Sequence, residues 1–102
     1  MSDQELLQVL HEMKYGTSQI IKVIDITLIK NKKKINKQKN FLNETNRDLS
    51  IMIRKIDILS NKIKNEEIEE DQINEEIETL YDYWEQLDRN KIKEIAKIID
   101  IL

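Results

Sequence analysis

Apolar residues return every seven positions along most of this 102-residue chain. One column of the heptad pattern runs from Leu7 to Trp84, and a companion column, offset by three, runs from Leu10 to Leu87. Two apolar positions in every seven are typical of α-helices that pack along a narrow seam, whereas the two-residue alternation of strands is nowhere sustained. The pattern therefore predicts an all-α, coiled-coil protein.

The seam is expected to consist of the apolar members of the two columns beyond the N-terminal segment. These residues are Ile21, Leu28, Ile35, Leu42, Leu49, Met52, Ile56, Leu59, Ile63, Ile73, Ile77, Leu80, Trp84 and Leu87. The companion column turns polar at Asn31, Gln38 and Thr45. Polar residues at such positions either fix the register of the helices at a cost in stability or mark where the seam opens, and the pattern leaves both alternatives open.

The first helix boundary is expected at Gly16. A glycine followed by Thr17 and Ser18 has the order of a C-terminal cap and the N-cap of the next helix. The sequence therefore predicts a short N-terminal helix over 1–16 and a long basic helix over 17–64.

A second boundary is expected at Asn65, where both apolar columns fail together. Lys62 and Lys64 precede this point and glutamates follow it, which places cations at one helix C-terminus and anions at the next N-terminus. We expect a tight turn there and an acidic helix over 66–102, with a weaker break at 88–90 after which the apolar register shifts by one. One uninterrupted helix is the alternative, because neither glycine nor proline compels a turn.

Charge is strongly segregated along the chain. The net charge is +8 over 22–64 and −11 over 65–88, although the whole chain carries only −3. Antiparallel packing sets these segments against each other, with the lysines between 55 and 64 beside the acids of 66–78, and Arg47 and Arg54 beside Asp82 and Glu85. A single domain over 1–102 built around an antiparallel helical hairpin satisfies this pairing, and so does an antiparallel dimer of unbroken helices.

A hairpin of two helices buries only one stripe of each helix, which leaves it marginally stable. Several isoleucines also lie outside the seam, at positions 51, 53, 58, 68 and 101. Further helices are therefore expected to cover them, either in a homo-oligomer or in a heteromeric bundle with a protein partner.

Composition excludes several kinds of chemistry. The chain has no cysteine, one glycine and one histidine, which rules out disulfides, thiolate metal sites and a phosphate-binding glycine loop. We expect no enzyme activity, cofactor, metal or small-molecule substrate. The expected function is a non-catalytic protein–protein interaction module, an assembly, adaptor or inhibitor protein of viral or plasmid origin, with Tyr81 and Tyr83 as candidate partner anchors.

Two alternatives use charged segments. Six lysines fall within 30–39, so the chain could be a nucleic-acid-associated protein that contacts phosphates through Lys32, Lys33, Lys34, Lys37 and Lys39. The acidic pairs Glu67/Glu70 and Glu85/Asp88 reproduce the E-x-x-E … E-x-x-D spacing of the all-α nucleoside-triphosphate pyrophosphatases, which makes a metal-dependent hydrolase the remote alternative.

No apolar run reaches the roughly 18 residues that a membrane span requires, and the N-terminus lacks the pattern of a secretory signal. We therefore expect an intracellular, soluble protein, located in the host cell if the chain is viral.

Overall fold

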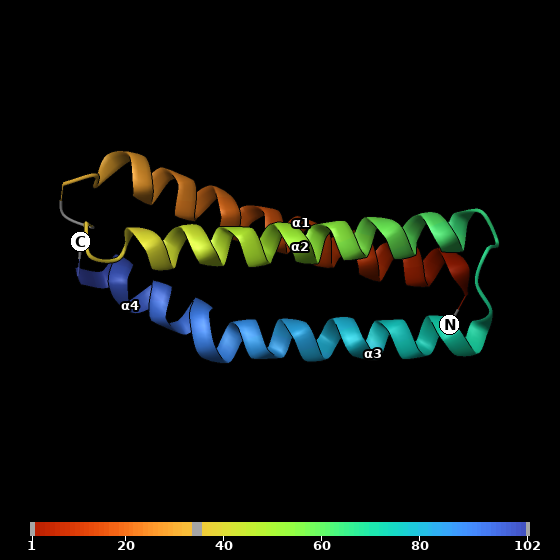
Figure 1. Cartoon of the computed structure of the whole chain (residues 1–102). Helices are drawn as coiled ribbons and strands as arrows, with labels where there is room; N and C mark the ends of the chain where they lie inside the picture. The colour runs from red at the N-terminus through yellow and green to blue at the C-terminus, as the bar shows by residue number, and fades with distance from the viewer. Residues whose placement is uncertain (1, 34–35, 102) are drawn as a thin grey trace.

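The computed structural model describes residues 2–33 and 36–101 and shows three helices packed in sequence order (Figure 1). Helix α1 spans Asp3–Lys30 and α2 spans Lys39–Lys64. The third helix is 32 residues long and consists of α3 (Glu70–Leu87), the π-helical turn η1 (Asp88–Ile92) and α4 (Lys93–Ile101). The all-α prediction is confirmed, and the molecule is an elongated bundle of 49 × 21 × 18 Å in which α2 runs antiparallel to the other two helices.

The predicted short N-terminal helix is wrong, because α1 continues through Gly16 for 28 residues. The hydroxyls of Thr17 and Ser18 do not cap a new helix but donate to the backbone carbonyls of Met13 and Lys14, at 2.7 and 2.8 Å. A glycine inside a helix costs only about 1 kcal/mol relative to alanine. Packing of α1 against the core outweighs that cost, since Thr17 is itself buried.

The predicted helix over 17–64 is also wrong, because α1 ends at Lys30 and α2 begins only at Lys39. At Asn31 the backbone N–H donates to the carbonyl of Thr27 (3.1 Å) and closes α1. A helix continued through this segment would stack like-charged lysines and bury nothing at Asn31 and Gln38. Asn31 and Gln38 thus flank the place where the seam opens, whereas Thr45 is buried within α2, and the expected two-helix hairpin becomes a three-helix bundle. Lys34 and Ile35 lie outside the described residues.

The predicted turn at Asn65 is confirmed, and the residue in the left-handed conformation is Glu66. The N–H of Glu66 donates to the carbonyl of Ile63 (3.2 Å) and that of Glu67 to the carbonyl of Lys62 (2.9 Å), the paired bonds of a Schellman motif. Glu66 has φ 55°, whereas Asn65 has φ −93°. The next helix starts later than predicted, at Glu70.

A capping box defines the start of α3. The side chain of Glu69 accepts from the backbone N–H of Gln72, and the side chain of Gln72 accepts from the N–H of Glu69. The expected break at 88–90 is a π-helical turn, through which the helix continues without stopping. A π turn holds one residue more than an α turn, which accounts for the one-residue shift of the apolar pattern beyond it.

The core divides into two clusters, one at each end of the bundle. The cluster at the 65–69 end contains Leu6, Leu10, Met52, Ile56, Leu59, Ile63, Ile73 and Leu80. The cluster at the 31–38 end contains Ile24, Leu42, Leu49, Leu87 and Ile95. Every helix contributes to both clusters, so the seam is covered by the chain's own third helix and an oligomer stays a prediction.

The structure buries most of the residues assigned to the seam. The buried ones are Leu42, Leu49, Met52, Ile56, Leu59, Ile63, Ile73, Leu80 and Leu87. The half-buried ones are Ile21, Leu28, Ile77 and Trp84. Additional core positions are Leu6, Leu10, Ile24, Ile95 and Ile98.

In the described part of the chain, no helix combines the length and the apolar character needed to cross a membrane.

Candidate functional site

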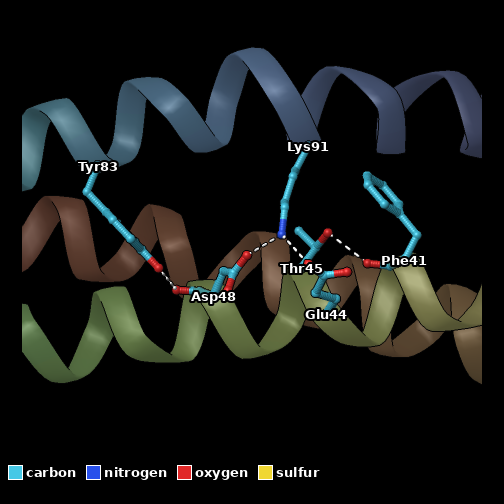
Figure 2. Close-up of polar contacts among 6 residues, drawn as sticks. All are labelled: Phe41, Glu44, Thr45, Asp48, Tyr83 and Lys91. Carbon is cyan, nitrogen blue, oxygen red and sulfur yellow. Dashed lines mark hydrogen bonds and ion pairs between the residues drawn. The ribbon is translucent and has the colours of Figure 1, made fainter.

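A polar network joins the π turn to α2 (Figure 2). The ammonium of Lys91 donates to the carboxylates of Asp48 and Glu44, the latter at 3.1 Å, and the hydroxyl of Tyr83 donates to the backbone carbonyl of Asp48 at 3.1 Å. The hydrogen bond to Asp48 raises the pKa of Lys91, and burial raises the pKa of Tyr83. Both groups are held protonated at neutral pH, so each can donate the hydrogen bond that joins the third helix to α2.

The expected charge pairing between α2 and α3 is found at one point, where Lys62 lies 3.5 Å from Glu76. Other pairs between helices carry the acid on α2 instead, as in the contact of Lys14 with Asp57 at 2.8 Å. The predicted pairing of Arg47 and Arg54 with Asp82 and Glu85 is not found among the described residues. Both arginines are exposed on α2.

An apolar groove of about 410 Å³ lies between α1 and α3. Its lining residues are Val9, Glu12, Met13, Gly16, Thr17, Tyr81 and Trp84. Val9, Met13 and Gly16 share a face of α1 because they are four and seven residues apart, and Tyr81 and Trp84 share a face of α3. These two faces meet because α1 and α3 pack on the same helix, α2.

Gly16 keeps this groove open. A Cβ atom at Gly16 would meet nothing within 4 Å, so the missing side chain leaves space rather than relieving a clash. Tyr81 lies beside that space and is 50% exposed, whereas Trp84 is half-buried against both core clusters. The groove therefore offers an aromatic surface that the chain itself does not cover.

The two tyrosines named as partner anchors lie on different sides of α3. Tyr81 lines the groove with α1, while Tyr83 contacts α2. The ammonium of Lys55 lies 5.7 Å from the ring centre of Tyr83. A two-residue separation turns a side chain about 200° around a helix, which is why the two cannot face the same neighbour.

The rim of the groove is acidic. Glu12 lines its α1 side, and Glu78 and Glu85 flank Tyr81 on α3. All three glutamates are exposed. Arg89 forms an ion pair with Glu85, which leaves the rim negative overall.

A second groove, of about 980 Å³, lies between the first half of α1 and the end of α2. Its walls are mostly polar and include His11, Ser60, Asn61 and Lys64. The Lys14–Asp57 ion pair belongs to its lining, and polar groups outweigh apolar ones on its walls.

The candidate phosphate-binding lysines lie at one end of the bundle. Lys32, Lys33 and Lys37 are exposed in the 31–38 turn, and Lys39 is exposed at the first residue of α2. The predicted helix over 17–64 would have placed these side chains on a helix, whereas in the structure Lys32, Lys33 and Lys37 lie between α1 and α2.

The acidic pairs are not brought together. Glu70 and Glu85 lie on the same helix, about 22 Å apart at 1.5 Å per residue, so a single ion cannot bridge the two pairs. Within residues 2–33 and 36–101, no group of three histidine, cysteine, aspartate or glutamate side chains is placed to hold a metal ion.

Comparison of this chain with family models, with curated proteins and with solved structures finds no match. The surface of the bundle is therefore the basis for assigning a function.

Proposed function

We propose that this chain is a non-catalytic protein–protein interaction module, an assembly, adaptor or inhibitor protein, that binds its partner through the α1/α3 groove. The single observation that carries this proposal is the half-exposed Tyr81 beside Trp84 and the unfilled space at Gly16. Tyrosine and tryptophan that line a pocket are the residues most often found at binding hot spots.

The energetics of Tyr81 support this assignment. An aromatic side chain presents 150–250 Å² to a partner, so covering the exposed half of Tyr81 contributes on the order of 2 kcal/mol. Val23 and Ile26, exposed by 47% and 51%, lie on the same side of α1 and extend the apolar surface beyond Gly16. A partner that covers both parts adds the burial of Val23 and Ile26 to that of Tyr81 against the cost of association.

A photo-crosslinking experiment tests the proposal in cells that express the protein. With p-benzoylphenylalanine in place of Tyr81, we expect a discrete adduct to one partner, because this side chain faces the groove. The same label at Arg54, exposed on α2, is the matched control and should give no such adduct. Filling the groove with Gly16→Met should remove the adduct. Equal labelling from both positions, or an adduct that Gly16→Met leaves intact, contradicts the proposal.

Nucleic-acid binding is the second candidate function, favoured by the exposed lysines that the 31–38 turn gathers at one end of the bundle. It predicts micromolar binding to duplex or single-stranded DNA that weakens steeply as salt increases. Changing Lys32, Lys33 and Lys37 to glutamine should abolish that binding. DNA binding that these changes leave unaltered rejects this second candidate.

A further inference from the structure

We infer that the α1/α3 groove binds an amphipathic helix whose polar flanks are basic. This inference rests on the proposed function and names the class of partner. It combines the shape of the groove with the charge of its rim.

The shape of the groove fits a helix. Helices α1 and α3 run in the same direction, both antiparallel to α2 (Figure 1), and their side chains line the two walls of the groove. A helix laid in this groove completes a four-helix bundle, the arrangement in which each helix packs on two neighbours. The groove is open beside Gly16, which has no side chain.

The length of the apolar surface sets the length of the partner. Val9, Gly16 and Val23 are spaced by seven residues along α1 and so share one face. At 1.5 Å per residue, Val9 and Val23 are about 21 Å apart. A partner helix of four turns, with apolar residues at heptad spacing, matches this length.

The charge of the rim selects a basic partner. Glu12 lines the α1 side and Glu78 flanks Tyr81 on α3, and neither takes part in an ion pair among the described residues. Lysine or arginine on both flanks of a docked helix would lie opposite these carboxylates, as charged residues beside a coiled-coil seam do.

The same charge disfavours a second copy in the groove. A twofold axis brings the same surface of both copies together, so each acidic rim would meet its own image. Like charges facing each other across a helical seam are destabilising. The occupant is therefore a different polypeptide of opposite charge.

Synthetic helices test this inference directly. The probe is a peptide of about 20 residues with leucine at the heptad positions and lysine on both flanks. Its matched controls are the same peptide with glutamate for lysine, and a scrambled peptide of equal composition. We expect micromolar binding of the lysine peptide, and affinities at least about tenfold lower for both controls.

Substitutions of Gly16 separate groove filling from loss of fold. Gly16→Met should weaken binding of the lysine peptide at least about tenfold by occupying the groove, whereas Gly16→Ala should leave it within about twofold. The Cβ atom of either residue enters open space, and we expect thermal unfolding followed by circular dichroism to show intact helix content in both variants. Changing Glu12 and Glu78 together to lysine should transfer the preference to the glutamate peptide.

The outcomes distinguish this inference from the proposed function. Equal binding of the lysine, glutamate and scrambled peptides overturns the basic-helix inference, as does self-association of the wild type that Gly16→Met abolishes. If the crosslink from position 81 still forms in either case, the interaction function stands and only the identity of the partner is wrong. If no peptide binds and position 81 gives no adduct, the proposed function fails as well.

Discussion

The two connections of the bundle end their helices by opposite means. At 65–69, a Schellman motif closes α2, a capping box opens α3, and lysines before the turn and glutamates after it match the helix dipoles. At 31–38, α2 begins after Gln38 without a side-chain cap, and its first turn carries Lys39 and no acid. Local hydrogen bonds and charges thus specify the end of α2 and the start of α3, whereas no side-chain cap specifies the start of α2.

This difference changes what each turn depends on. Hydrogen bonds and charges stabilise the 65–69 turn locally. At 31–38, Asn31 closes α1, but the start of α2 has no side-chain cap and depends on the packing of the cluster beside it. Local opening should therefore begin at the 31–38 end.

The largest effect on the free energy of unfolding is expected from truncating buried leucines in the two core clusters. Leu49 at the 31–38 end and Leu59 at the 65–69 end are almost completely buried, so truncating either to alanine should lower the free energy of unfolding by about 3 kcal/mol. Denaturant unfolding measures this loss. Ile58→Ala, at a side chain 49% exposed, is the control and should cost less than about 1 kcal/mol. Hydrogen exchange should accelerate over the 31–38 end in Leu49→Ala, and unchanged exchange there would contradict the comparison.

Removing the cation of the polar network should have the next largest effect. Lys91→Met leaves Asp48 and Glu44 without their partner, and Lys91 is only 21% exposed. We expect a loss of about 1–2 kcal/mol in the free energy of unfolding, since a half-buried charge pair contributes more than a surface one. Lys97→Met is the matched control, because its contact with Glu94 is a surface pair. Equal effects of the two changes would mean that the network does not stabilise the 31–38 end.

The same network predicts a dependence on alkaline pH. The pKa of Lys91 and that of Tyr83 are both raised in the folded state, so their stabilisation is complete below the unfolded values near 10 and is lost as pH rises through the folded ones. The free energy of unfolding should fall above about pH 10. The fall should be shallower in Lys91→Met combined with Tyr83→Phe, and an identical slope would contradict this assignment.

A smaller gain is expected from the left-handed residue of the 65–69 turn. Glu66 adopts φ 55°, a conformation that costs a residue with a Cβ atom about 1 kcal/mol. Glu66→Gly should therefore raise the free energy of unfolding by up to about 1 kcal/mol, measured by thermal unfolding. Glu67→Gly, at a residue without positive φ, should give no such gain. A loss of stability in Glu66→Gly would show that the carboxylate outweighs the backbone strain.

The smallest effect concerns the uncapped start of α2. Lys39→Glu exchanges an unfavourable cation for an anion at a helix N-terminus and should add about 0.5 kcal/mol to the free energy of unfolding. Lys64→Glu makes the same exchange at the C-terminus of α2 and should subtract a similar amount. Chemical denaturation at low salt measures both, and shifts of the same sign would exclude the helix dipole as the cause.

The sequence by itself determined the class of the fold and much of its core. The heptad columns place residues such as Leu42, Ile56 and Leu80 inside, because a seven-residue repeat brings the same face of a helix back to the same neighbour. The turn after Lys64 was also readable, since its signals are local. So was the register shift beyond 88–90, because an inserted residue moves every later apolar position by one.

Only the tertiary structure decided whether the chain continues at Gly16 or turns at 31–38. A glycine ends a helix only where no packing compensates its cost, and a polar seam position ends one only where no other helix covers it. Both outcomes depend on a third helix that lies far away in the sequence. The groove arose in the same way, since Gly16 and Tyr81 become neighbours only once α1 and α3 share the surface of α2.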